Sequence, residues 1–278
     1  MVFRRHLSPE GNALGLKETD RWEDVTAFKP DAAFICTPTH NHIEDALRCA
    51  RSGMRLFIEK PLSDRMEGVD ELTGLCARKK LTAYVAYCLR FHPVIEEVKR
   101  MLGGVKVIDG RVVCASLLHR WRPKAETPNY SFYRGQGGGV ILDLSHEFDH
   151  IQYLVGPVVS ITGDKGRKSS VTVDAEDYCD AQVQTANGAR IKVHLDLFSE
   201  KETRCLDFET DRGRITADLL TGEINQAGTP PKRVAVDRDA FMRRQTQYFL
   251  DHIHDPGLMN NVSEAKTLLE HIVRFRDA

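Results

Sequence analysis

Two short apolar runs joined by an amphipathic segment most constrain what this chain can fold into. The runs cover residues 32–36 and 54–58, and residues 43–52 between them have the spacing of an amphipathic helix. This order of strand, helix and strand is typical of a βαβ unit in a parallel sheet. Ligands of open α/β sheets bind at the carboxyl ends of the strands. The residues that follow the two runs, Thr37-Pro38 and Glu59-Lys60-Pro61, are therefore candidate site residues.

The same alternation continues through the first 92 residues. A further apolar run covers residues 82–88, and residues 66–79 have a helical pattern. We therefore expect residues 1–92 to form a Rossmann-type parallel sheet domain with helices on its faces. The opening residues Met1–His6 resemble the end of a strand of that sheet.

The rest of the chain, residues 93–278, has a different pattern. Its expected strands alternate apolar and polar residues and are joined by turns such as Ala186-Asn187-Gly188, which favours an open, largely antiparallel sheet. These strands cover residues 105–117, 158–163, 178–185, 190–197, 203–209 and 213–218, and helices are expected at residues 94–102, 140–154, 237–254 and 262–276. The fold class is thus α/β followed by α+β. Alternating Val, Leu and Phe also suggest a sheet whose outer face another subunit covers, which predicts a homo-oligomer.

Composition excludes several kinds of partner. With a net charge of -1 and no block of basic residues, the chain has no field that would attract nucleic acid or an anionic membrane. No apolar stretch approaches the length of a membrane span. The seven cysteines have no regular spacing, which is typical of reduced thiols and predicts a cytoplasmic protein.

Four motifs, in order along the chain, resemble the Gfo/Idh/MocA family of nicotinamide-dependent sugar oxidoreductases. The first two are Thr37-Pro38 with His42, and Glu59-Lys60-Pro61. The others are Arg90-Phe91-His92-Pro93 and a glycine run, residues 137–139, followed by Asp143, His146 and Asp149. The resemblance implies NAD or NADP as cofactor and a small sugar-like alcohol or ketone as substrate.

One family signature is missing from the sequence. Family members open with a strand, a G-x-G-x-x-G turn and a helix that holds the cofactor pyrophosphate, and this sequence contains no such motif. We expect the chain to lack that unit of about 30 residues, and we interpret Gly135–Gly139 as a flexible approach to a helix. The alternative function is a catalytically impaired sugar-binding or assembly protein on the same fold.

The resemblance assigns the chemistry to three residues. Lys60 would hydrogen-bond the reacting oxygen, His146 would act as general base, and Asp143 would orient His146. Asp149 is expected to be structural. A metal site built from Asp143, His146, Asp149 and His150, or from His40 and His42, is disfavoured, so no metal is expected.

Further residues are expected to bind the cofactor and the substrate. The two loop histidines would line the cofactor edge or cap the next helix. Arginines after the first strand suit a 2′-phosphate and slightly favour NADP. The cofactor set is Thr37, Pro38, His42, Glu59, Lys60, Arg4 and Arg5. Aromatic rings and guanidinium groups suit sugars, which gives the substrate set Arg90, Trp121, Arg122 and Tyr130. The segment around Trp121 equally suits an oligomer contact, and its local sequence resembles members acting on amino sugars or nucleotide sugars.

Overall fold

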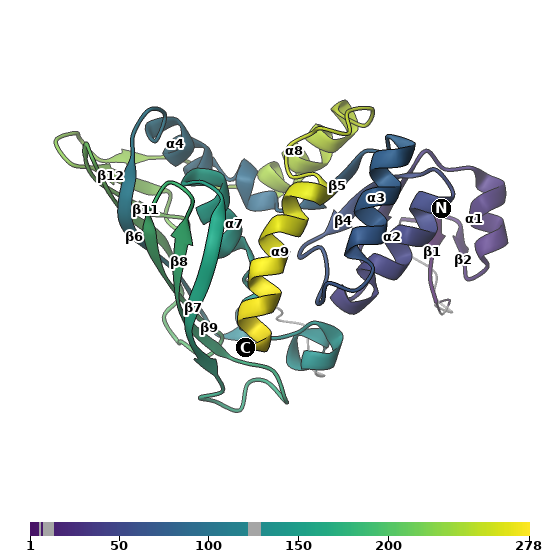
Figure 1. The fold of residues 1–278 in the computed structure, drawn as a ribbon, viewed down its shortest axis with the longest axis horizontal. Coiled ribbons are helices and arrows are strands. Elements are labelled where there is room, and N and C mark those ends of the chain that lie inside the picture. The colour runs from purple at the N-terminus through teal and green to yellow at the C-terminus, as the bar shows by residue number, and fades with distance from the viewer. Residues whose placement is uncertain (6, 8–13, 122–128) are drawn as a thin grey trace.

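A three-stranded parallel sheet lies in the first third of the chain. The computed structural model describes residues 1–278 except residues 6, 8–13 and 122–128. Strands β3 (Ala32–Ile35), β4 (Arg55–Glu59) and β5 (Ala83–Ala86) pair in that order. Helices α2 (His42–Arg51) and α3 (Val69–Lys79) pack on one face, where Leu56 and Ile58 are buried (Figure 1). The sequence pattern therefore predicted this βαβ arrangement correctly.

The opposite face of this sheet is covered from the far end of the chain. The ring of Phe249, on α8 (Arg238–Asp251), lies 5.5 Å from that of Phe57 and 5.6 Å from that of Phe34. Tyr84 joins the same buried cluster. We expected a domain boundary at residue 92. Helix α8 lies after this boundary in the sequence, yet it packs on the parallel sheet that lies before it.

A second, smaller parallel sheet precedes the first. Strand β1 (Val2–Phe3) pairs with β2 (Glu18–Thr19), and α1 (Trp22–Phe28) follows. Arg48 of α2 holds this unit, because its guanidinium lies 4.1 Å from the ring centroid of Trp22. Among the described residues, neither β1 nor β2 pairs with β3, so the two parallel sheets are separate.

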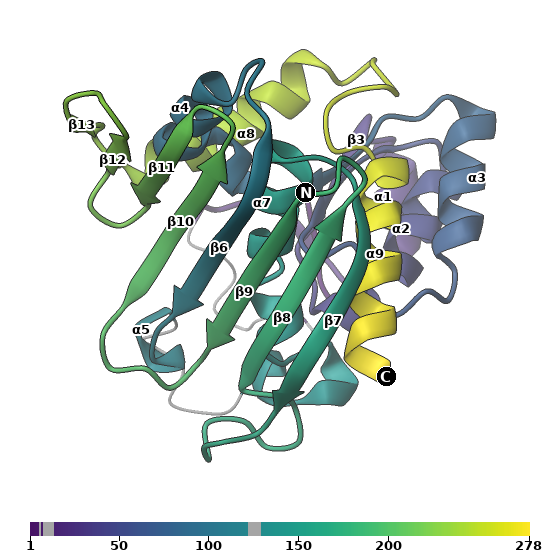
Figure 2. The same cartoon turned by 60° about the vertical axis from the view of Figure 1, so that its left-hand side comes forward.

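The remainder of the chain forms an open eight-stranded sheet in the order β13-β12-β11-β10-β6-β9-β8-β7 (Figure 2). All neighbours are antiparallel except β6 and β9, so the expected open, largely antiparallel sheet is confirmed. The strands are β6 (Val107–Ala115), β7 (Val158–Gly166), β8 (Tyr178–Thr185), β9 (Arg190–Asp196), β10 (Thr203–Thr210), β11 (Gly213–Asp218), β12 (Glu223–Gln226) and β13 (Lys232–Arg233).

The outer face of this sheet is polar. In β8, Ala181 and Val183 are buried, whereas the alternate residues are exposed. Cross-strand register places polar side chains side by side, including Gln182, Lys192, Arg111, Asp207 and Thr216. The apolar side chains of β8 therefore point inward, since an antiparallel sheet can leave one face in water, whereas Ile108 of β6 and Val159 of β7 are exposed.

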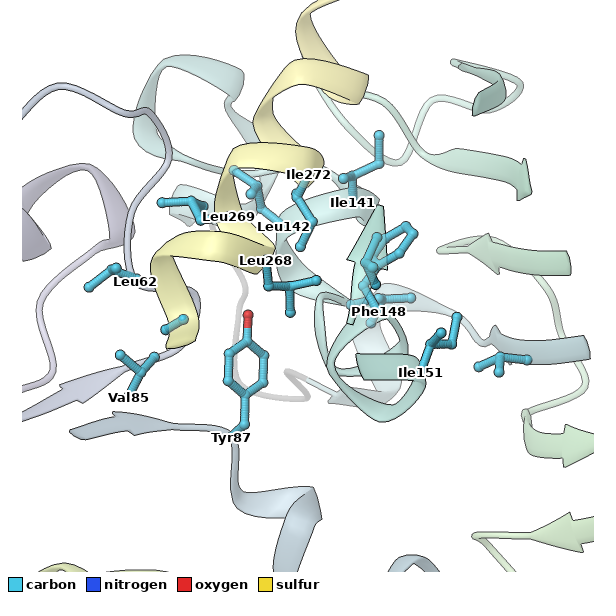
Figure 3. Packing of buried hydrophobic residues seen from close by; sticks show 14 of the residues in the cluster. Leu62, Val85, Tyr87, Ile141, Leu142, Phe148, Ile151, Leu268, Leu269 and Ile272 are labelled. Carbon is cyan, nitrogen blue, oxygen red and sulfur yellow. The ribbon is translucent and has the colours of Figure 1, made fainter. Parts of the chain in front are cut away.

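Helix α9 (Val262–Asp277) joins the two sheets into one core. Its Leu268, Leu269 and Ile272 lie between Val85 of β5 and Ile141 (Figure 3). Shorter helices complete this layer: α4 (Pro93–Met101), α5 (Leu118–Trp121), α6 (Val140–Asp143) and α7 (His146–Leu154). No helix of the described residues is both long enough and apolar enough to cross a membrane.

Arg90 is buried in an ion pair. It lies in the 3-10 helix η2 (Cys88–Phe91), and its Nη2 donates to Asp149 Oδ1 at 2.6 Å while Nη1 lies 2.8 Å from Glu264 Oε1. The side chains of Arg90 and Asp149 are each 1% exposed. The expectation that Arg90 contacts substrate disagrees with this geometry, because its donors are committed inside the protein. Asp149 has the structural role that we expected.

Asp149→Asn should lower the free energy of unfolding by about 3 kcal/mol, because removing one partner leaves a buried guanidinium short of its counter-charge. Urea denaturation followed by circular dichroism measures this. The matched control is Asp207→Asn, whose carboxylate accepts from Arg214 Nε at 2.7 Å on the exposed face. That change should cost less than about 1 kcal/mol. Equal, small effects of both substitutions would contradict the assignment.

Candidate functional site

Lys60 reaches from the three-stranded parallel sheet to α6, one of the helices that pack on the eight-stranded sheet. It follows β4, and its Nζ donates to the carbonyl oxygen of Asp143 at 2.6 Å. In a continuous helix this carbonyl would accept from the amide of residue 147. Here Glu147 N donates to Leu144 O instead, at 3.1 Å. The single helix that we expected at residues 140–154 is therefore two helices, and the break at Leu144–Ser145 leaves the Asp143 carbonyl available to Lys60.

His146 is the first residue after this break. Its ring lies 5.4 Å from that of Tyr87, edge to face. Burial, together with the cations Lys60 and Arg204 nearby, holds the pKa of His146 well below its usual range. The ring is therefore neutral near neutral pH and can accept a proton. Asp143, expected to orient His146, contributes its backbone carbonyl to Lys60, and its carboxylate is buried.

The glycine run packs tightly between the two halves of the chain. Gly137 (φ 80°) and Gly139 (φ 101°) have left-handed backbone angles that favour glycine. A Cβ on Gly137 would lie 2.7 Å from Thr39 Cβ, and one on Gly138 would lie 2.4 Å from Tyr130 O. The interpretation of Gly135–Gly139 as a flexible approach is therefore wrong for residues 137–139, where each added Cβ would clash, whereas a Cβ on Gly135 would meet no atom within 4 Å.

His42 ties together the two loops that follow β3 and β4. Its Nδ1 lies 2.9 Å from Pro61 O and its Nε2 lies 2.8 Å from Thr37 O. The ring is 1% exposed. His42 was expected to bind the cofactor, but its ring instead fixes the loops that carry Thr37 and Lys60. His40 makes a similar contact to a backbone carbonyl, because its Nδ1 lies 3.1 Å from Gln136 O.

The other expected cofactor residues lie at the same sheet edge. Thr37 Oγ1 donates to Asp45 Oδ2 at 2.9 Å, and Arg5 Nη2 lies 3.6 Å from Asp45 Oδ1. Asp45 therefore contacts both Arg5, which follows β1, and Thr37, which follows β3. Arg4 pairs with Glu18 at 3.1 Å.

Two further expected residues lie at the carboxyl ends of the strands. Pro38 precedes the 3-10 helix η1 (Thr39–Asn41) and is exposed. Glu59 is largely buried, and this burial raises the pKa of its carboxyl group. Its Oε2 accepts from the amide of Lys60 at 3.3 Å.

The expected substrate residues are only partly described. Arg122 lies outside the described residues, and of Trp121 only the backbone, which ends α5, is described. Tyr130 begins the 3-10 helix η3 (Tyr130–Phe132) and lies beside Gly138. Arg90 lies apart from this group, in its buried ion pair.

A buried ion pair beside His146 was missed by sequence reasoning. Glu147 Oε1 accepts from Arg204 Nε at 2.8 Å, and the Glu147 side chain is 1% exposed. Burial raises the pKa of Glu147 even though Arg204 opposes the shift. The partners are far apart in sequence, and nothing in the local pattern of β10 singles out Arg204.

A nicotinamide dinucleotide fits this edge in part. Arg4 and Arg5 suit the adenosine end, and Thr37, Glu59 and Lys60 suit the nicotinamide end. The first turn of α2 carries Glu44 and Asp45, and these carboxylates would repel a pyrophosphate at that helix N-terminus. Of the described residues, no group of three His, Cys, Asp or Glu could hold a metal ion.

Among curated proteins, an inositol 2-dehydrogenase from Rhizobium meliloti is 29% identical over 237 residues, which is 80% of this chain and 68% of that protein. An oxidoreductase of Bacillus subtilis, YrbE, is 30% identical over 137 residues, or 49% of this chain and 38% of its own length. The match to a 2,7-anhydro-N-acetylneuraminate hydratase of Mediterraneibacter gnavus, at 25% identity, spans 48% of this chain and 36% of that protein. The chain thus matches well under half the length of the last two.

Solved structures share the fold. A levoglucosan dehydrogenase in complex with NADH superposes with a TM-score of 0.80 at 18% identity and covers 94% of this chain and 82% of its own. The UDP-N-acetylglucosamine 3-dehydrogenase GnnA from Acidithiobacillus ferrooxidans gives a TM-score of 0.78 at 19% identity, with the same coverage.

Two family models divide the chain as the two sheets do. A model described as the oxidoreductase family with an NAD-binding Rossmann fold matches residues 5–87. A model of the GFO/IDH/MocA C-terminal domain matches residues 98–216. The chain therefore belongs to the GFO/IDH/MocA family of oxidoreductases.

Proposed function

We propose that this protein moves a hydride between a nicotinamide cofactor and a carbon that bears a hydroxyl group in a sugar-like molecule. The observation that carries the proposal is the position of Lys60, whose ammonium group reaches the Asp143 carbonyl beside the neutral His146. A hydrogen-bond donor and a proton acceptor thus lie together at the carboxyl edge of the parallel sheet, where ligands of α/β proteins bind.

The two side chains divide the acid-base work. When bound, the nicotinamide accepts or donates the hydride. In oxidation, the ammonium group of Lys60 donates a hydrogen bond to the reacting oxygen, and the His146 ring accepts the hydroxyl proton. In reduction the proton returns along the same path. The backbone carbonyl of Asp143 and the tightly packed residues 137–139 fix the positions of Lys60 and His146 relative to each other.

Similar proteins support the proposed substrate class. Inositol, levoglucosan and UDP-N-acetylglucosamine occur in the names of similar dehydrogenases. Their shared chemistry is a ring with several hydroxyl groups. Trp121, Arg122 and Tyr130 remain the proposed substrate contacts, because aromatic planes and guanidinium donors recognise such rings.

Strand order supports the proposal of a missing phosphate-binding unit. A doubly wound dinucleotide domain has the order 3-2-1-4-5-6. The described strands form two separate parallel sheets, β1-β2 and β3-β4-β5. We infer that β2 and β1 take positions 3 and 2, and that β3, β4 and β5 take positions 4, 5 and 6, which leaves position 1 without a described strand. Position 1 is the strand that leads into the glycine turn. Phe34 of β3 is 48% exposed beside this position.

The cellular setting is also part of the proposal. None of the seven cysteines forms a disulfide, which suits the reducing cytoplasm. We also propose a homo-oligomer, now because of charge rather than apolar residues. The polar outer face of the large sheet carries charges of both signs, which a second copy of the chain could match.

The alternative is a sugar-binding or assembly protein with impaired catalysis. The interrupted sheet and the acidic first turn of α2 favour it for this chain. Calorimetric binding of a sugar, without any turnover at saturating NAD or NADP, would support the alternative over the enzyme.

Lys60→Met and His146→Ala should each reduce turnover roughly 10²–10⁴-fold, the usual cost of removing a positioned acid or base. The measurement is the absorbance of reduced cofactor with myo-inositol, levoglucosan and UDP-N-acetylglucosamine at saturating NAD or NADP. Lys79→Met is the matched control, because that lysine donates to the backbone oxygens of Ala50 and Arg51 at the C-terminal end of α2, the end opposite to the site. Near-full activity of both site variants would refute the proposed proton path.

The acid limb of kcat/KM for oxidation should lie below pH about 6.5, the ordinary histidine pKa, because the pKa of His146 is lowered. A base with a lowered pKa stays unprotonated as the pH falls through that value. The buried His92, His146 and His150, all with lowered pKa, make the fold less stable below the same pH, since the unfolded chain binds more protons there. Circular dichroism at each pH separates unfolding from protonation. An acid limb at or above pH about 6.5 contradicts the assignment.

Residues 1–278 should bind NADPH weakly, because no glycine turn is present in the sequence and α2 begins with carboxylates. Fluorescence titration measures the affinity. NADPH should bind more tightly than NADH, and Arg5→Gln should remove the difference. Saturation at low micromolar NADPH would show that other groups hold the phosphates.

A further inference from the structure

A second buried histidine lies one helical turn beyond His146. His150 is 0% exposed, and within the described part of the chain neither of its ring nitrogens has a hydrogen-bond partner. The Nδ1 atom of His146 is likewise buried without a partner. Buried polar atoms in native proteins are bonded to protein or to ordered water, so these three nitrogens call for a common explanation.

The separation of the two rings suits a single bridging water. Their centroids are 6.3 Å apart and their planes differ by 28°. A direct hydrogen bond would bring two nitrogens to about 3 Å, which nearly parallel rings at this separation do not reach. One water that bonds both rings spans the remaining distance.

The charges around the pair keep both rings neutral. Arg204 of β10, His92 at the start of α4 and Arg90 of η2 face His150, and Lys60 and Arg204 face His146. The acids Glu147 and Asp149 are already paired with Arg204 and Arg90. Burial is the largest cause of the lowered pKa of both histidines, and the cations Lys60 and Arg204 at His146 and Arg204 and Arg90 at His150 lower it further. The pKa of His92 is itself lowered to about 4, so that ring is neutral near neutral pH. A neutral imidazole has one donor and one acceptor nitrogen, and a partner on one nitrogen fixes which is which.

We propose that one buried water joins His146 Nδ1 to His150, so that His150 is the positioning residue that holds His146 in the Nδ1–H tautomer. In this arrangement Nδ1–H donates to the water, the water donates to a nitrogen of His150, and Nε2 of His146 is left to accept a proton. When Nε2 takes the hydroxyl proton, the O–H bond breaks, an N–H bond forms, and the water stabilises the resulting imidazolium through Nδ1–H. The role of His146 as base rests on the proposed function, whereas the tautomer does not.

The test is nitrogen NMR of the protein labelled with ¹⁵N-histidine, at neutral pH. One-bond and two-bond couplings distinguish the protonated ring nitrogen from the bare one, and His146→Gln identifies the His146 signals. The wild-type protein should show His146 protonated at Nδ1. An Nε2–H tautomer in the wild type overturns the proposal and requires no variant to fold.

Variants then test whether His150 sets this tautomer. His150→Phe keeps the ring and removes both nitrogens, and it should shift His146 at least partly to Nε2–H. His271→Phe changes a half-buried histidine on α9 and should leave the His146 signals in place. An unchanged Nδ1–H tautomer in folded His150→Phe contradicts the role of His150.

Kinetics separates this inference from the proposed function. If the protein oxidises a sugar, His150→Phe should reduce kcat more than it changes KM, by less than the 10²–10⁴-fold cost of losing the base itself. If no sugar is oxidised but the tautomer responds as described, the proposed function fails and the histidine pair stands. If the protein oxidises a sugar and the His146 tautomer is unchanged in His150→Phe, the inference about His150 is wrong while the proposed function stands.

Discussion

The hydrogen bond from Lys60 to the Asp143 carbonyl is the contact on which the site depends. It exists because the chain breaks its helix at Leu144–Ser145, where Glu147 N turns to Leu144 O and releases the carbonyl of Asp143. The same break begins α7 at His146, which sets that ring beside Lys60. The tightly packed glycine run fixes the approach to α6, so the site is assembled from both sheets with little freedom to shift.

Sequence patterns predicted the elements that local periodicity controls. The βαβ unit around Lys60 and the alternating strands of the large sheet follow from repeats of apolar residues, which burial enforces. The helix break did not follow, because residues 140–154 keep a helical apolar spacing and the break is stabilised by Lys60, far away in sequence. Arg90 was misjudged for the same reason, since Asp149 and Glu264 approach it only in the folded chain. The outer face of the large sheet was misjudged because an apolar residue count does not say which face each residue occupies.

The residues proposed to bind the two ends of the cofactor differ in burial. Residues that suit the nicotinamide end are held by buried contacts, above all those of His42 with Pro61 O and Thr37 O. Near the adenosine end, Arg4 and Arg5 are about half exposed and pair with carboxylates at the surface. Buried contacts therefore hold the residues proposed for the nicotinamide end, whereas those proposed for the adenosine end lie at the surface.

The most direct measurement of the central claim is a crystal structure of residues 1–278 soaked at saturating concentration with NADPH and myo-inositol. We expect the nicotinamide and one inositol hydroxyl to lie between Lys60 and His146. The hydroxyl oxygen should lie about 3 Å from Lys60 Nζ and from His146 Nε2. Ordered cofactor or sugar bound elsewhere, with the Lys60 to Asp143 contact unchanged and the His146 ring untouched, would contradict it.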